Sequence, residues 1–159
     1  MYITVDEYIA LYDPVDRGTF NRLSFDACRY IDRHTTGIDG VKKLQKAFPV
    51  DEYSKTAVKH CAAAIVNFLI QIDAAEKNAA ATRGYTETGN GFQGKVVSSV
   101  SAGNESISYS SGDAKTAVEL ALADTSAKNK VISDIVYDYL SGITDANGVN
   151  LLYMGSYPG

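Results

Sequence analysis

The sequence has few of the residues on which disulfide-bonded scaffolds and thiol or imidazole catalysts depend. Its 159 residues include two cysteines, two histidines and no tryptophan. The two thiols, Cys28 and Cys61, are too few for a disulfide scaffold, and a chain of this length does not need one. We therefore expect one soluble domain with free thiols and a modest core.

Long hydrophobic runs are also missing. The longest charge-free apolar stretch, Cys61 to Ile72, has twelve residues, whereas a membrane-spanning helix needs about 20. The first residues, Met1 to Glu7, lack the basic and continuous apolar regions of a signal peptide. These features predict a protein made in the cytoplasm, with no membrane partner.

Positive charge is not in excess, because 15 basic residues face 19 acidic ones. A net charge of -4 makes the chain a poor candidate for gripping nucleic acid through its phosphates. The acidic surplus lies in residues 84–159, with 4 basic and 8 acidic side chains, while residues 1–83 are neutral. The composition changes at the same place, since 84–94 is rich in glycine and 95–111 in serine.

Apolar periodicity predicts a mainly α fold, a small bundle of about four to five helices with an inserted β-hairpin and an extended C-terminal tail. Thr4 and Glu7 fit a capping box that would start the first helix, and Pro14 would stop it. The short segment Val41–Phe48 suggests one further helical turn. The main helices are expected over 5–12, 19–34, 51–80 and 113–141, with Gly142 as the last C-cap.

The helix over 51–80 carries a broad apolar stripe and is expected to be central. Its end, Asp73 to Arg83, keeps helix propensity but loses apolar anchors, so it should project or fray. The last helix is interrupted by the polar run Asp124 to Lys130. We favour one helix with a weak or broken centre; the alternative is that Ser126 caps a second helix.

Two segments are candidates for contacts with other proteins. Residues 95–110 read as two β-strands around a turn, joined to the helical body 1–83 by a flexible connector at 84–94. Residues 143–159 form an apolar, aromatic tail that should dock on its own body or on a partner. The candidate interaction residues are Val96, Val100, Ile107, Tyr109, Leu151, Leu152, Tyr153 and Met154.

The candidate catalytic and metal-binding residues do not have the spacing that such sites require. His60 and Cys61 are adjacent, so on a helix their side chains diverge by about 100° and do not form a catalytic pair. The turn Asp145–Gly148 has some of the residues of a calcium-binding loop. However, Ile143 and Met154 would stand at its first and twelfth positions, where the loop requires oxygen ligands. We expect no catalytic, cofactor or metal site, and we expect the basic group Lys42, Lys43 and Lys46 to form a solvated helix face.

A set of short motifs is spread along the chain: Met1–Tyr8, Phe20–Leu23, Tyr30–Thr35, Lys95–Ser101, Ser106–Tyr109, Tyr139–Gly142 and Asn147–Gly155. In this order and spacing they resemble the head–tail connector (adaptor) proteins of long-tailed bacteriophages and prophages of Gram-positive bacteria. The resemblance covers nearly the whole chain, although the run 78–94 and the interruption at 124–130 depart from it.

The resemblance implies a virion structural protein made in the host cytoplasm. Twelve copies would form a ring beneath the portal protein and bridge it to a stopper or tail-completion protein, while DNA passes through the lumen. It implies no catalytic residue or cofactor, and it assigns subunit and portal contacts to 95–110 and 143–159. The alternatives are another neck or tail-completion component, a small cytoplasmic enzyme and, last, a DNA-binding module.

Overall fold

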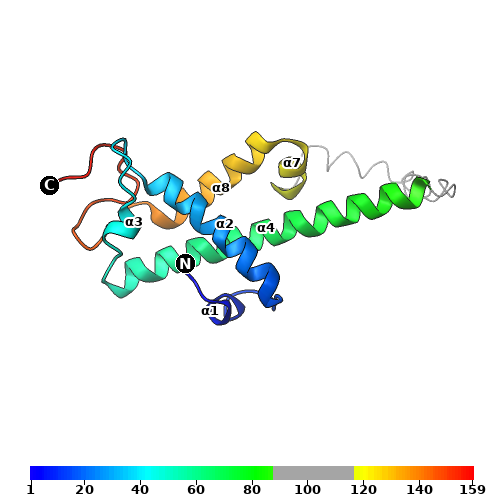
Figure 1. Ribbon diagram of the computed structural model, residues 1–159, viewed down its shortest axis with the longest axis horizontal. Coiled ribbons are helices and arrows are strands. Elements are labelled where there is room, and N and C mark those ends of the chain that lie inside the picture. Colours follow the sequence, from blue (N-terminus) through cyan, green and yellow to red (C-terminus); the bar gives the residue numbers. More distant parts are fainter. Residues whose placement is uncertain (88–116) are drawn as a thin grey trace. The chain divides into compact units, whose positions relative to one another are not determined.

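The computed structural model describes residues 1–87 and 117–159, and this part of the chain is mainly helical (Figure 1). The predicted mainly α fold is confirmed. Within the described ranges 1–87 and 117–159 there is no strand, only isolated bridges from Thr36 to Lys42 and from Thr144 to Asn150. The predicted hairpin at 95–110 lies outside the described residues. The helices are α1 (Val5–Ile9), α2 (Arg17–Thr35), α3 (Lys43–Lys46), α4 (Glu52–Glu87), α7 (Ala117–Ala123) and α8 (Thr125–Leu140).

The chain divides into two compact units. The first joins Met1–Ile70 to Lys130–Gly159, and the second is Gln71–Asn129. The first unit therefore holds α1 to α3, the first half of α4, most of α8 and the C-terminal segment. The single connector domain expected for 1–159 stays a prediction.

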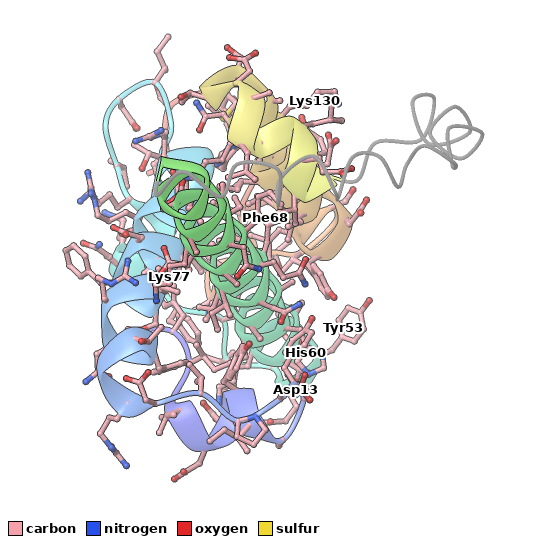
Figure 2. All side chains as sticks on the ribbon, turned by 90° about the vertical axis from the view of Figure 1, so that its right-hand side faces the viewer. Asp13, Tyr53, His60, Phe68, Lys77 and Lys130 are labelled. Carbon is pink, nitrogen blue, oxygen red and sulfur yellow. The ribbon has the colours of Figure 1, made fainter. Side chains whose placement is uncertain are left out.

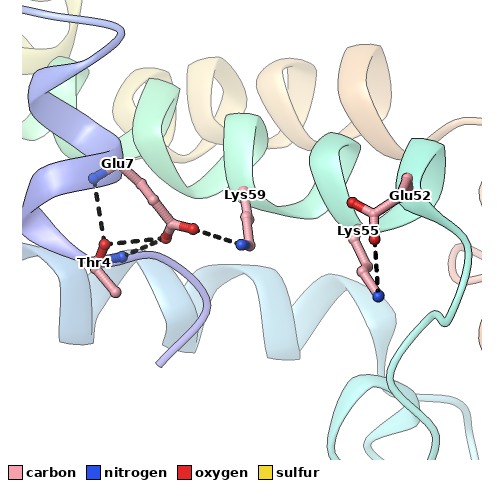
Figure 3. A network of polar contacts seen from close by, with 5 residues as sticks. All are labelled: Thr4, Glu7, Glu52, Lys55 and Lys59. Carbon is pink, nitrogen blue, oxygen red and sulfur yellow. Dashed lines mark hydrogen bonds and ion pairs between the residues drawn. The ribbon is translucent and has the colours of Figure 1, made fainter.

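The start of the chain follows the predicted capping box. The Thr4 hydroxyl accepts from the Glu7 backbone N–H at 3.2 Å, and the Glu7 carboxylate accepts from the Thr4 N–H at 2.9 Å. Lys59 on α4 forms an ion pair with the same carboxylate, so the cap also ties α1 to α4 (Figure 3). One turn before Lys59, Lys55 pairs with Glu52 at 3.1 Å on the surface of α4 (Figure 3).

The core of the first unit is built around α4, as its broad apolar stripe predicts. Ile65 and Val66 are fully buried although they are adjacent in sequence, so the helix is covered on more than one side. In the part of the chain with assigned positions, α4 holds one stretch, Glu52–Ala81, that could cross a membrane by length and composition. Half of it is buried within the protein, as in a core helix. The buried partners on the other helices are Phe20, Leu23, Ala27, Ile31, Ile132, Val136 and Leu140.

Three predicted boundaries are wrong. Helix α1 ends at Ile9 and not near residue 12. Helix α4 continues to Glu87, so 84–87 belong to a helix rather than to a flexible connector; the preceding alanine-rich run favours continuation. The last helical segment is two helices, α7 and α8, separated at Asp124. The cap of α8 is Asp124, whose carboxylate accepts from the Ser126 N–H at 3.0 Å, and not Ser126.

The C-terminal segment folds back on the first unit instead of extending. Gly142 follows α8 with φ of 80°, the left-handed conformation expected of a glycine C-cap. The predicted turn at Asp145–Gly148 is present, and the Gly148 N–H donates to the Asp145 carbonyl at 3.0 Å. The chain then runs back, with the Leu151 N–H donating to the Ile143 carbonyl at 2.9 Å. The tail is thus a folded part of the first unit.

Candidate interaction surface

A buried lysine fastens the C-terminal segment to the helical body. The side chain of Lys43 has no exposed area, although we expected it on a solvated helix face. Its ammonium group donates to the carbonyls of Thr35 at 3.2 Å and Leu151 at 3.3 Å, and also to that of Tyr153. These three bonds use all three N–H donors. Burial lowers the pKa of Lys43, whereas the nearby negative charges of Asp39 and Asp145 act in the opposite direction and raise it.

The turn of the tail is organised by Asp145, which is buried. One carboxylate oxygen accepts from the backbone N–H groups of Asn147 at 2.8 Å and Val149 at 2.9 Å. The other accepts from the Tyr157 hydroxyl at 2.6 Å, and this bond raises the pKa of Tyr157. The ammonium of Lys46 lies 5.0 Å from the Tyr157 ring centre, a cation–π contact. Asp145 therefore acts as a structural turn residue.

The four predicted interaction residues of the tail fall into different environments. Leu151 has no exposed area and belongs to the core. Leu152 is half-buried, whereas Tyr153 and Met154 are 51% and 56% exposed. Only the last two present substantial apolar area to a partner. The other four predicted residues, Val96, Val100, Ile107 and Tyr109, lie outside the described residues.

The backbone of the exposed tail residues is bonded to the loop after α2, which carries another exposed apolar residue, Ile38. The Ile38 N–H donates to the Met154 carbonyl at 2.8 Å, and the Ile38 side chain is 82% exposed. We call Ile38, Tyr153 and Met154 the tail patch. Such a gathering of exposed apolar side chains is typical of a protein contact site.

A second surface lies on the outer face of α2. A pocket of about 500 Å³ opens between this helix and the N-terminus, with Met1 and Phe25 on its apolar side. Phe25 is 60% exposed and stands on α2 at the side opposite the buried residues. Figure 2 shows α2 and α8 on opposite sides of α4. The other lining residues are Tyr2, Cys28, Arg29, Asp32, Lys42 and Gln45.

The same face is basic. A neighbouring pocket of about 200 Å³ is lined by Arg29, Arg33 and Lys42, with Asp32 as its acidic side chain. Asp32 is already engaged, since it accepts from the Tyr2 hydroxyl and from the Gln45 amide at 2.6 Å. Arg29 pairs loosely with Asp26 at 3.7 Å, and Arg33 and Lys42 then face the single negative charge of Asp32, which leaves one net positive charge at this pocket.

The two thiols and the Tyr2 phenol have raised pKa values. Burial raises the pKa of the Cys61 thiol, which has no exposed area, and it also raises that of Cys28. The pKa of the Tyr2 phenol is raised by burial and by its bond to Asp32. A high pKa keeps these groups protonated at neutral pH, and the protonated thiol is not the nucleophile.

The two histidines lie in different environments. The Nδ1 atom of His34 lies 2.8 Å from the Tyr30 carbonyl of the preceding helical turn, and His60 is partly exposed on α4. In the segments 1–87 and 117–159, no group of three or more histidine, cysteine or carboxylate side chains could hold a metal ion.

Sequence reasoning missed the α2 face and the buried lysine. Phe25 falls outside the apolar stripe of α2 and is flanked by arginines at 22 and 29, which is the signal that could have found it. Lys43 gives no such signal, because nothing near it in sequence shows that residues 151 and 153 would surround it.

Comparison with protein-family models, with curated proteins and with solved structures finds no match for this chain.

Proposed function

We propose that this chain is a head–tail connector (adaptor) protein of a long-tailed bacteriophage or prophage. Copies of it form a ring beneath the portal protein and join the portal to a stopper or tail-completion protein. The ring is a part of the virion neck, assembled from subunits made in the host cytoplasm. The order of motifs from Met1–Tyr8 to Asn147–Gly155 suggested this assignment.

The observation that carries the proposal is the amount of apolar side chain left on the surface of so small a helical body. Among the residues that the structure describes, five large apolar ones besides Met1 are 60% exposed or more, and exposed apolar groups that gather in patches mark contact sites. Phe25 belongs to the α2 face, and Ile38 belongs to the tail patch. The five are Phe25, Ile38, Val50, Tyr53 and Tyr137.

The tail patch is the portal or neck contact in this proposal. It is held on a rigid base, because Lys43 and Asp145 fix the backbone of the tail on both sides of Leu151. A contact surface that is ordered before binding loses little conformational entropy on association. The segment 95–110, with Val96, Val100, Ile107 and Tyr109, supplies the second contact in this proposal.

The charge of the chain fits a ring through which DNA slides. A net charge of -4 does not attract the phosphate backbone, so the lumen would let DNA pass without holding it. DNA is therefore a passing partner in this proposal.

Negative-stain electron microscopy and solution mass test the proposal, with this chain alone and mixed with the portal protein encoded in the same genome. We expect rings seated on the portal. Ile38→Glu combined with Met154→Glu should abolish portal or neck binding, whereas Leu11→Glu, at another exposed apolar position, should leave it unchanged. Absence of any ring and any portal binding would overturn the proposal. Binding to a tail protein alone would identify a tail-completion component instead.

A further inference from the structure

We propose that copies of this chain associate head to tail, with the basic face of α2 on one copy docked against the acidic face of α8 on the next. This inference deepens the proposed connector function and rests on it for the closure of the ring. It commits the α2 face to one occupant, a second copy of this chain.

The first half of the contact is the α2 face. Phe25 and Arg29 stand one turn apart, and Arg33 follows after another turn, so the three share one side of the helix. Lys42 extends the positive charge beyond the end of α2. An exposed phenylalanine among cations, beside a pocket of about 500 Å³, calls for a partner that brings both an apolar group and negative charge.

The second half is the outer face of α8 within the same unit. Asp134 and Asp138 are exposed and stand one turn apart, on the side away from the buried Val136. Lys130 pairs with Asp134 at 3.0 Å, so the net negative charge of this face comes from Asp138. Tyr137 lies next to Asp138 in sequence and is 60% exposed. Aromatic groups and arginine are the residues enriched at contact centres, and an arginine stacks well on a tyrosine ring. The α8 face thus offers both an exposed aromatic side chain and negative charge to the α2 face.

The charges also decide the symmetry of the contact. A two-fold dimer through α2 would set Arg29 and Arg33 against their own copies, and like charges at a contact are unfavourable. Pairing α2 with α8 places opposite charges together. Because the two helices lie on opposite sides of α4 (Figure 2), each copy keeps one free face after pairing. Such a head-to-tail contact builds a ring when the rotation closes.

Charge exchange tests the pairing. Arg29→Glu/Arg33→Glu and Asp134→Lys/Asp138→Lys should each weaken self-association by about tenfold or more, because each sets like charges against each other. The four-fold variant, with both faces reversed, should recover association to within about threefold of the original. A mixture of the two double variants should also associate. Sedimentation velocity over a concentration series, alone and with portal, measures each case.

The control variant is Lys55→Glu/Lys77→Glu on α4. It changes the net charge by the same amount as Arg29→Glu/Arg33→Glu, but it should associate like the original chain. Unfolding midpoints in urea establish that each variant is folded. Full association of both double variants would overturn the α2–α8 contact, and rings on the portal would then leave the connector function standing. Failure of the original chain both to form any ring and to bind the portal would refute the connector itself. Loss of duplex DNA binding in the arginine variant, with association unchanged, would assign the face to DNA and overturn the inference.

Discussion

The ammonium group of Lys43 donates to the carbonyl oxygen of Leu151 at 3.3 Å, although 108 residues separate them in sequence. This bond joins the start of α3 to the C-terminal segment. Since Lys43 also contacts the carbonyls of Thr35 and Tyr153, one side chain links three parts of the first unit. The tail patch owes its position to this link.

Replacement of the buried lysine should loosen the tail. Lys43→Met keeps the side-chain volume but leaves three carbonyl groups without their donor, and we expect a loss of about 2–4 kcal/mol in the free energy of unfolding. Lys42→Met, at the exposed neighbouring position, should change stability by less than about 0.5 kcal/mol. Urea unfolding measures both, and hydrogen exchange at Tyr153 localises the effect. Equal stabilities of the two variants would show that the lysine bonds are not structural.

The tail residues should separate into structural and surface groups. Leu151→Ala removes a side chain with no exposed area, so it should cost about 2–5 kcal/mol. Met154→Ala removes a side chain that is 56% exposed, and its effect on stability should stay within about 0.5 kcal/mol. Thermal and urea unfolding give both values. A large loss for Met154→Ala would mean that the tail patch is part of the core.

The helices could be predicted because their signals are local. The capping box at Thr4, the stripe around Ile65 and the glycine C-cap at 142 are each encoded within a few residues. Boundaries were less predictable at Asp124, where a capping aspartate and a polar run mark the same place and sequence alone does not decide between a weak helix and a break.

The contact surfaces depended on information that the sequence does not carry locally. Leu151 and Met154 look alike in an apolar run, yet one is buried and the other exposed, because a turn centred on Asp145 and the bonds of Lys43 set the register of the tail. A lysine in a basic cluster is normally solvated. Its burial at position 43 follows from carbonyl groups that only the folded chain brings together.

Acid should destabilise the protein through three carboxylates. The pKa of Glu7 is lowered, first by its bond to Lys59, and the pKa values of Asp39 and Asp51 are lowered by backbone N–H donors at Tyr157 and Ser54. A folded-state pKa below the unfolded value of about 4 gives stability that is present above that pH. It is lost as pH falls through the folded-state pKa.

The measurement is urea unfolding at a series of acidic pH values. The variant Glu7→Gln/Asp39→Asn/Asp51→Asn cannot titrate at these positions, so its stability should depend less steeply on pH than that of the original chain. Identical pH profiles would assign the acid sensitivity to other carboxylates.

The two thiols should differ in reactivity with a disulfide reagent. Cys61 has no exposed area and Cys28 is partly exposed, while the pKa of each is raised by burial. In the folded protein we expect slow reaction at Cys28, below the rate of a free thiol, and none at Cys61 until urea unfolds the chain. Cys28→Ala should remove the reaction of the folded state. Rapid reaction of both thiols with the reagent in the absence of denaturant would contradict the buried position of Cys61.

Glycine is required where the loop after α2 meets the tail. A Cβ atom at Gly37 would lie 2.5 Å from the backbone carbonyl oxygen of Gly155, which cannot move without displacing the tail. We expect Gly37→Ala to cost about 1–3 kcal/mol. The amide hydrogens of Ile38 and Tyr157, which bond to Met154 and Asp39, should then exchange faster.

The control for this variant is Gly18→Ala in the first turn of α2. A Cβ there meets only the movable carboxylate of Asp16, at 3.2 Å, and alanine favours the helix, so stability should stay equal or rise by up to about 1 kcal/mol. Opposite signs for the two glycine variants would establish that the tail is packed against the loop in solution. If Gly37→Ala were as stable as Gly18→Ala, the tail would have to sit away from Gly37, and the tail patch would lose its base.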